Sequence, residues 1–540
     1  MRAAEFKGPI FFAGFLLSFF LSLDQRLVAQ PRPIAIVGGT LIDGTGRPPL
    51  PDAAVIIHEG RFREVGRRGD ISIPQGAEVI EAKGKTILPG LVDGHCHYRD
   101  WMGEIYLALG VTTCPDISNN PTEWILAQRE GIQKGTIRGP RVWATGNHVD
   151  GPPPSGTGRL RRQRGSIIVQ TSDDARKAVR ELVEKGVDGI KLFERLTPEV
   201  AKAAAEEAHR HGRPVFGHSL DIFAAADAGY QSVEHSWSVL YSSIRDPKKK
   251  AELDIARMTG KVNTAEVHVH MEPEMFDRII KVMVEKRIHW SPTWGTWFRP
   301  LSPQAAEMKR REVALLRNPG LRYLPPYILK TTEQFFAMYE GASAERRAQL
   351  AEGYERVQDF VRRFVGAGGR LHSGSDPNNV LAGYGLHAEF QLLIDAGLSP
   401  PQVIQSASLN VALAWGKAKD YGSVETGKVA DIVIVRGDPI RDISATQEVE
   451  MVFMDGKPVD ISLNPDYRNP IPRPLPDRFV PTLSGLSPPS LTEGSTGRVK
   501  LSGSGFRPTH QALLSGRKVE SRFINSKELE VHIPAVEAGT

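Results

Sequence analysis

The stretch Gly90-Leu91-Val92-Asp93-Gly94-His95-Cys96-His97 joins a short apolar run to two histidines at positions i and i+2. Alternate side chains of a β-strand point to the same face, so His95 and His97 should project together from the end of one strand. Paired imidazoles bind metal ions when further nitrogen or oxygen donors converge on them. Cys96 should face the opposite side, and we interpret it as a packing residue that is not a nucleophile.

Outward from this stretch, apolar strand-like runs alternate with helical patterns up to about Trp415. The runs are residues 91–97, 111–114, 142–145, 189–193, 214–218, 232–235, 288–293 and 370–376. This alternation predicts an α/β fold, a (β/α)8 barrel of the TIM type, in which the carboxyl ends of the strands converge on one face. About 76 residues separate the last two runs. Their helical pattern fits either a lid over that face or a peripheral excursion.

More potential ligands lie on other predicted strands. They are Lys191 inside the fourth run, His218 at the end of the fifth, His235 at the end of the sixth and Asp376 at the end of the eighth. A single buried histidine is more often a packed core residue. Because five strands supply polar groups to the same face, the pattern favours a metal site there.

With these motifs placed, the sequence resembles the amidohydrolase superfamily, and most of all the branch with imidazolonepropionase-like enzymes and metal-dependent prolidases. The resemblance covers about residues 33–443. It is carried by residues 90–97, Gly110-Val111-Thr112-Thr113, Gly374-Ser375-Asp376 and the stretch from Gly422 to Val433.

The resemblance implies a site with two divalent metal ions. Zinc is the expected metal, and Mn, Co and Ni also fit nitrogen and oxygen ligands of this type. His95 and His97 would hold one ion, and His218 with His235 the other. Lys191 would bridge the two ions as a carbamate made from CO2, because a plain ammonium has no lone pair to offer a metal. Asp376 would bind a metal and carry the proton during catalysis.

The implied reaction is attack of an activated hydroxide on a small-molecule amide: a dipeptide, an N-acyl amino acid or a cyclic amide. The same hydroxide would also serve an ester, a lactone or a phosphotriester. A non-catalytic exported binding protein is the alternative outside the enzymes. His148, after the third run, and His387, after the eighth, are weaker candidates for substrate binding.

Residues 1–29 have the order of a secretory signal: a charged start, a short apolar stretch and a small residue, Ala29. The apolar stretch is too short for a stable membrane span. We therefore expect a bacterial periplasmic or secreted protein. Residues 30–88 and 418–463 are β-rich, and the resemblance implies that they form one small composite β domain beside the barrel of residues 89–417.

The chain after the β-rich region divides again. Six prolines between Pro465 and Pro481 predict a stiff, extended linker over residues 464–480. Residues 481–540 resemble the Ig-like IPT/TIG β-sandwich module, apart from a missing last strand. An open sheet edge invites pairing, so a homo-oligomer is an open alternative. The segment after Asn464 is expected to be dispensable for catalysis.

Composition restricts the remaining classes. The chain has 68 Lys and Arg against 63 Asp and Glu, a net charge of +5, and no long basic block. Nucleic acid is therefore not an expected partner. A hydrophobic content of 40% excludes disordered and collagen-like proteins. Two cysteines cannot build a disulfide framework.

Overall fold

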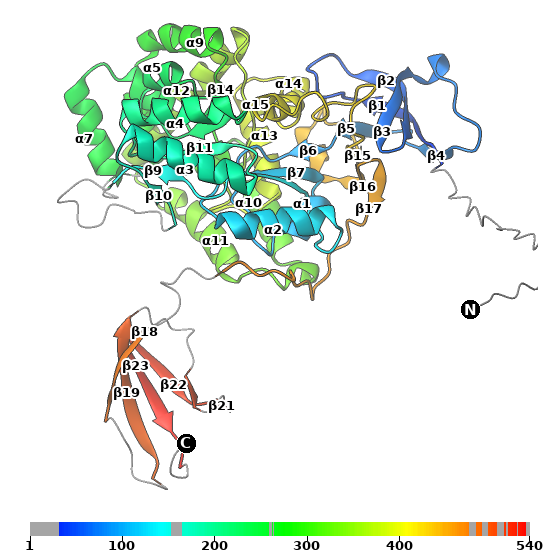
Figure 1. Cartoon of the computed structure of the whole chain (residues 1–540). Helices are drawn as coiled ribbons and strands as arrows, with labels where there is room; N and C mark the ends of the chain where they lie inside the picture. Colours follow the sequence, from blue (N-terminus) through cyan, green and yellow to red (C-terminus); the bar gives the residue numbers. More distant parts are fainter. Residues whose placement is uncertain are drawn as a thin grey trace, which may run out of the picture.

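The structure is a computed structural model that describes residues 32–152, 165–258, 262, 264–474, 482–488, 495–504, 512–514, 517–525 and 527–535. The predicted signal, residues 1–29, lies outside the described residues. Figure 1 shows the chain from the blue strands near the N-terminus, through the cyan, green and yellow strands and helices, to the orange and red strands at the C-terminus. None of the described helices is long and apolar enough to cross a membrane.

The two β-rich stretches meet in one sheet of eight strands. Its path is β17-β16-β15-β5-β1-β2-β3, and β4 pairs with β1. The strands are β1 (Ile34–Leu41), β2 (Leu50–His58), β3 (Arg61–Arg67), β4 (Glu78–Glu81), β5 (Lys85–Pro89), β15 (Ile432–Arg436), β16 (Val449–Met454) and β17 (Lys457–Val459). Ile434 of β15 lies opposite Ile87 of β5, which joins the two distant segments (Figure 1).

The strands between these stretches form two parallel sheets. One has the order β6-β7-β8, and the other β10-β9-β11-β12-β13-β14. Their bounds are β6 (Leu91–Val92), β7 (Val111–Asp116), β8 (Arg141–Ala144), β9 (Val149–Asp150), β10 (Ile167–Ile168), β11 (Ile190–Leu192), β12 (Val215–Gly217), β13 (Ser232–Glu234) and β14 (His289–Ser291).

The described strands do not form one continuous closed ladder. A backbone hydrogen bond from Asp188 N to Ala144 O (2.8 Å) links the two sheets, and Gly94 N donates to Ser373 O (2.9 Å) of the eighth predicted run. The eighth predicted run contributes only an isolated bridge, between Leu371 and Trp290. The observed architecture is thus a mixed α/β fold of the TIM-barrel type with interrupted pairing.

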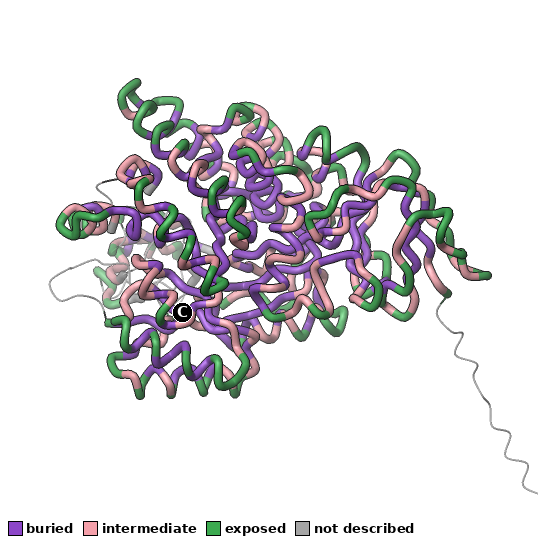
Figure 2. The backbone as a smooth tube through the Cα atoms, turned by 90° about the horizontal axis from the view of Figure 1, so that it is seen from above, coloured by how far each residue is buried: buried purple, intermediate pink, exposed green. Residues whose placement is uncertain are grey.

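Helices follow the strands and cover their outer side. They are α1 (Gly103–Ala108), α2 (Thr122–Gln133), α3 (Ser172–Lys185), α4 (Pro198–Arg210), α5 (Ile222–Ala228), α6 (Trp237–Ser243), α7 (Pro247–Met258), α8 (Thr264–Val267), α9 (Phe276–Glu285), α10 (Ala305–Leu316), α11 (Tyr327–Glu340), α12 (Ala344–Gly366), α13 (Tyr384–Asp395), α14 (Pro400–Ser406) and α15 (Leu409–Ala414). Figure 2 shows the buried residues gathered in the interior and exposed residues on the outer turns. Local signals set their ends; α3, for example, begins at a capping box on Thr171 and ends at the left-handed Gly186.

The long segment between the seventh and eighth runs contains α10, α11 and α12. Phe360 of α12 packs edge-on against Trp290 of β14, with ring centroids 5.3 Å apart. Glu312 of α10 accepts a hydrogen bond from Leu381 N (2.8 Å), and Tyr339 of α11 donates to Trp297 O (2.7 Å). The segment therefore packs on the loops that follow β14 and the eighth run.

Cys96 and Cys114 form a disulfide, with their Cα atoms 6.1 Å apart. The interpretation of Cys96 as a simple packing residue is thus corrected. Cys96 makes an isolated parallel bridge to Asp116, beside the end of β7. Because the two cysteines lie on neighbouring parallel segments, the bond ties the histidine-bearing stretch to β7.

The C-terminal region forms a separate antiparallel sheet of order β18-β19-β23-β22. Its strands are β18 (Thr482–Ser487), β19 (Gly497–Ser504), β22 (Ser521–Asn525) and β23 (Glu528–Ile533), and β20 (Leu513–Leu514) pairs with β21 (Arg517–Lys518). A small core of Val519, Leu529 and Val531 lies beneath it. The described part of the predicted linker, residues 464–474, is not a free spacer; Trp124 of α2 donates a hydrogen bond to Ile471 O (3.1 Å).

Candidate metal site

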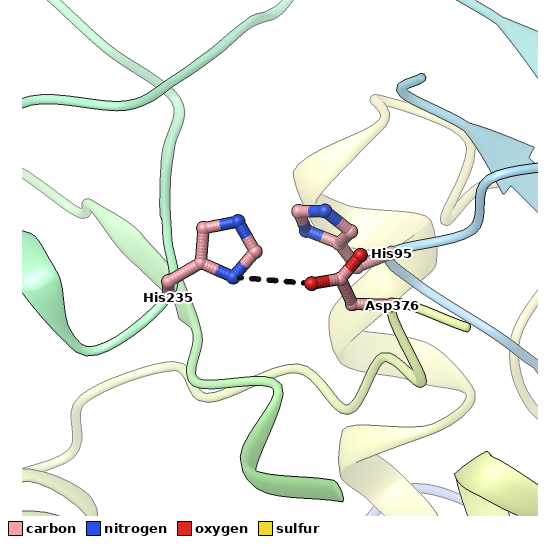
Figure 3. Close-up of side chains that lie close together, drawn as sticks. All are labelled: His95, His235 and Asp376. Carbon is pink, nitrogen blue, oxygen red and sulfur yellow. Dashed lines mark ion pairs between the residues drawn. The ribbon is translucent and has the colours of Figure 1, made fainter. Parts of the chain in front are cut away.

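Three side chains from three separate strand ends converge at the carboxyl face. Single ligand atoms of His95, His235 and Asp376 all lie within 4.8 Å of one another, and all three residues are buried. Figure 3 shows the three side chains turned toward one another, and His235 Nδ1 lies 3.8 Å from Asp376 Oδ2. His97 joins the group, because its Nε2 lies 3.3 Å from Asp376 Oδ1. The structure therefore brings the first, sixth and eighth runs together, as the spacing predicts.

Glycines explain how the first and eighth runs come so close. A Cβ on Gly374 would lie 2.4 Å from the Cβ of His95, and a Cβ on Gly94 would lie 2.6 Å from Ser373 O. Either contact is too short for real atoms, so only glycine fits at both positions. The glycines of the two motifs thus allow Asp376 to reach the histidine-bearing strand.

His235 and Asp376 hold unusual backbone conformations, with φ of +63° and +40°. Side-chain-bearing residues rarely adopt this region, and such strain persists where the surroundings fix it, often at functional sites. Here Trp290 Nε1 donates to His235 O (2.8 Å), and Asp376 N donates to His95 O (2.9 Å). These bonds aim both side chains into the cluster.

The imidazoles are held as neutral rings. Burial is the largest cause that lowers the pKa of His95, His97, His218 and His235 well below its ordinary value, and the charge of Lys191 adds to it. A neutral imidazole keeps one nitrogen lone pair, which is the form that binds metals. The histidines are therefore in the right protonation state for ligands.

Neighbouring groups orient three of these rings through Nδ1. Glu234 Oε2 lies 2.6 Å from His95 Nδ1, and Glu194 Oε1 lies 3.3 Å from His218 Nδ1. The Thr293 hydroxyl donates to Pro292 O (2.8 Å) and so accepts from His235 Nδ1, 2.6 Å away. Each ring proton is thereby assigned to Nδ1, and Nε2 is left to face a ligand.

Lys191 lies at the centre of β11 with apolar neighbours on both sides. Its side chain is 1% exposed, and Nζ has no hydrogen-bond partner among the described residues. Burial lowers its pKa to about 8, although the charges of Glu234, Asp376 and Glu194 act in the opposite direction. An unpaired buried ammonium is costly, so this position is suited to a modified or ligand-bound lysine.

Asp376 is equally unusual as a carboxyl group. Burial is the largest cause that raises its pKa to about 7, and the Lys191 charge opposes the rise. Asn378 Nδ2 donates to its Oδ1 (2.6 Å). A carboxyl group with a pKa near neutrality can both take up and give back a proton, which suits a general acid–base residue.

The two weaker candidates have different outcomes. His148 is buried, stacks on Phe193 with ring centroids 5.1 Å apart, and places Nε2 2.9 Å from Ile117 O. Phe193 in turn packs on His218, so His148 lies next to the cluster. His387 has both ring nitrogens engaged, with Thr446 and Leu109 O at 2.9 Å each. It anchors α13 in the packing, and the expectation of a substrate contact there is corrected.

Sequence reasoning missed two buried carboxylates. Glu234 directly precedes His235, and the alternation of β13 points it to the same side as Ser232, where it meets His95. Asp93 accepts from Ser375 N (2.7 Å) and from the Tyr106 hydroxyl (3.0 Å). Its place inside the histidine motif was the available signal: a charged residue in an apolar run requires buried partners.

The residues present fit divalent metal ions. The donor set combines imidazole nitrogens with carboxylate oxygens, which suits zinc and similar ions. His218 Nε2 is buried and, among the described residues, has no hydrogen-bond partner, as is also true of Lys191 Nζ. Two buried polar atoms without hydrogen-bond partners in the described part of the chain, beside the three convergent ligand atoms, fit a site for divalent metal ions.

Known proteins share both sequence and fold with this chain. The imidazolonepropionase of Symbiobacterium thermophilum is 24% identical over 429 residues, which cover 75% of this chain and 91% of that protein. The adenine deaminase of Paracoccus denitrificans is 35% identical over only 92 residues, 16% of this chain and 15% of the deaminase. The chain thus spans a small part of that second relative.

Two solved structures extend the likeness to the fold. A Xaa-Pro dipeptidase with bound methionine gives a TM-score of 0.56 at 20% identity, covering 79% of this chain and 100% of that chain. Phenylurea hydrolase B gives 0.56 at 22% identity, with 79% and 97% covered. The model of the amidohydrolase family matches residues 86–459, from β5 to the end of β17. Because that match covers well over half of the sequence, the chain belongs to the amidohydrolase family, a family of hydrolases that act on C–N bonds.

Proposed function

We propose that this protein is an exported, metal-dependent hydrolase of amide bonds in small molecules. The observation that carries the proposal is Lys191, a buried amine without a hydrogen-bond partner among the described residues, facing a cluster of neutral histidines and Asp376. Family membership and the dipeptidase and phenylurea hydrolase neighbours support an amide-type bond.

The proposed site holds two divalent ions, with zinc as the first metal to test. His95 and His97 would hold one ion, His218 and His235 the other, and a carbamate on Lys191 would bridge them. Bound divalent metal polarises a carbonyl group and lowers the pKa of water. The side chain of Asp376 takes up a proton at Oδ and delivers it to the leaving amine. Glu234, Glu194 and Thr293 keep the rings oriented throughout.

The proposed substrate is a dipeptide, an N-acyl amino acid or a cyclic amide. The site supports cleavage of an amide bond but does not indicate which side chains the substrate carries. Substrate specificity depends on the loops, whereas the candidate ligands lie at the strand ends.

Export is proposed from two independent features. The first 29 residues have the order of a secretory signal. The Cys96–Cys114 disulfide is typical of proteins that fold in an oxidising compartment such as the periplasm. The protein would therefore meet its substrate outside the cytoplasm.

Two further proposals concern the fold. The C-terminal antiparallel sheet would belong to an IPT/TIG-like module, and a full eight-stranded barrel would enclose the site.

Protein loaded with zinc in the presence of bicarbonate should hydrolyse members of a panel of dipeptides, N-acyl amino acids, cyclic amides, lactones and phosphotriesters. Elemental analysis should give two zinc ions per chain, and mass analysis under mild conditions should show CO2 on Lys191. His211→Ala, which alters a partly exposed ring at the end of α4, is the matched control and should behave as the wild type. Turnover of lactones or phosphotriesters alone would refute amide hydrolysis as the function.

A further inference from the structure

Residues 460–474, here named the strap, lie along the barrel although they fall outside the family match that ends at residue 459. The Asp460 and Ser462 carbonyls both accept from Arg138 (2.6 Å each), and Asn464 N donates to Glu104 (2.9 Å). Leu463 also packs on the main core. The strap is therefore an addition of this chain to the body of the hydrolase.

The second half of the strap follows α2 toward the carboxyl face. Gln128 of α2 donates to Ile471 O (2.7 Å) and accepts from Asn469 (2.7 Å). Tyr467 packs against Tyr323 with ring centroids 5.3 Å apart. These contacts fix where the strap leads, so residues 464–474 are not expected to be dispensable.

The strap delivers Arg473 to the loops that carry the first ligands. Arg473 N donates to Asp100 (3.0 Å), and its Nε donates to Asn120 Oδ1 (2.7 Å). Arg99 lies two residues after His97, donates to His97 O (3.1 Å), and approaches the same Asn120 oxygen at 3.4 Å. Asn120 follows β7, and parallel strands open at their carboxyl ends onto the catalytic face. Two guanidinium groups thus meet at one amide oxygen beside the metal site.

No carboxylate in the described part of the chain forms an ion pair within 4.0 Å with either guanidinium. Asp116, the buried acid nearest in sequence to Asn120, is already committed to Tyr98 N (2.9 Å) and the Ser118 hydroxyl (2.7 Å). Asn120 Nδ2 donates to both carboxylate oxygens of Asp116 (3.2 Å each). These bonds orient the Asn120 amide so that its Oδ1 faces the two arginines. Burial, followed by the like charge of Arg99, lowers the pKa of Arg473 to about 10, although the charges of Asp116 and Asp100 act in the opposite direction.

Two half-buried cations side by side repel each other, and an anion between them relieves that repulsion. Guanidinium groups bind carboxylates through paired, charge-assisted hydrogen bonds. We propose that Arg473 and Arg99 together bind a carboxylate group of the substrate, so that the enzyme selects acyl amino acids and peptides with a free carboxylate over neutral amides. This inference rests on the proposed amide hydrolase function, and it makes Arg473 a specificity-determining residue from outside the family match.

The test uses the full chain with three variants of the same strap. Arg473→Ala removes the proposed contact, and Arg468→Ala removes an equal charge from an exposed position. Each active dipeptide or N-acyl amino acid is paired with its C-terminal carboxamide. Loss of a hydrogen bond to a charged group should raise KM for the free acids about 10- to 100-fold in Arg473→Ala, with KM for the carboxamides and kcat nearly unchanged. Arg468→Ala should resemble the wild type, and Arg473→Lys should recover part of the loss.

A binding measurement separates this inference from the proposed function. Calorimetric titration with 4-phenylbutanoate should show tighter binding to the wild type than to Arg473→Ala, whereas 4-phenylbutanol should not distinguish them. If no amide is hydrolysed but this difference is seen, the proposed function fails and the carboxylate site stands. Equal losses on acids and carboxamides, or no loss at all, would overturn the assignment of Arg473.

Discussion

Glu234 should control metal affinity without touching the metal. Its Oε2 holds His95 Nδ1 at 2.6 Å and its Oε1 accepts from the Ser232 hydroxyl at 2.8 Å, and Glu234 is fully buried while His95 is 1% exposed. In Glu234→Gln the amide oxygen can still face His95, and the amide nitrogen can donate to Ser232, whose hydroxyl lies 2.8 Å from His372 Nε2. The shape and the hydrogen bonds survive, but the negative charge that makes His95 a better ligand is lost.

Replacing such a partner of a metal-binding histidine typically costs about 10- to 100-fold in metal affinity or activity. That range corresponds to about 1.4–2.7 kcal/mol. Competition titration with a zinc chelator measures the affinity, and it needs no knowledge of the substrate. Ser232→Ala is the matched control, since it removes the second hydrogen bond of Glu234 but leaves the contact with His95. A Glu234→Gln protein that binds zinc as tightly as the wild type would refute this role.

Three further perturbations test the rest of the site. Lys191→Ala should abolish measurable turnover, and added short carboxylic acids should partly restore it by filling the place of the carbamate; a variant that stays active without them would exclude the bridge. Asp376→Asn should keep most of the metal but lower kcat about 10²–10⁴-fold, because general acid–base catalysis contributes on that order, and a near-normal kcat would assign the proton to another group. Burial raises the pKa of Glu389 to about 8. Between the ordinary pKa of a glutamate and pH 8, the folded chain therefore keeps a proton on Glu389 that the unfolded chain releases. The free energy of unfolding should thus fall as pH rises from about 4.5 to about 8, by on the order of a few kcal/mol. Denaturant unfolding at pH 5 and pH 8 measures this difference, which should be smaller in Glu389→Gln. An unchanged difference in the variant would contradict the buried proton.

Local pattern was sufficient to predict which apolar runs carry the candidate ligands. His95, His235 and Asp376 end apolar runs, and carboxyl ends of parallel strands face one side, so their convergence could be predicted from spacing alone. The glycines that permit the close approach are visible in the same motifs. The sequence also marks the β-rich character of the two stretches that meet at β5 and β15, although their pairing came only from the family resemblance.

Groups that act through partners distant in the chain could not be predicted in this way. In the sequence, nothing distinguishes Glu234 from other acidic residues, because its hydrogen-bond partner His95 is 139 residues away. His387 reads as a site residue until Leu109 O and Thr446 occupy both of its nitrogens.

Cys96 and the strap show the same division. Strand alternation correctly turns Cys96 away from the histidines, but the disulfide depends on the register of the neighbouring strand. Prolines in the segment after Asn464 predict its extended form, whereas its docking on α2 depends on side chains more than 300 positions earlier. Periodicity and motif spacing are local, so the sequence alone determined which apolar runs carry the candidate ligands. The hydrogen-bond partners of buried polar groups often come from residues that are distant in the sequence. Only the tertiary structure therefore decided how the candidate ligands are oriented and which guanidinium groups lie beside them.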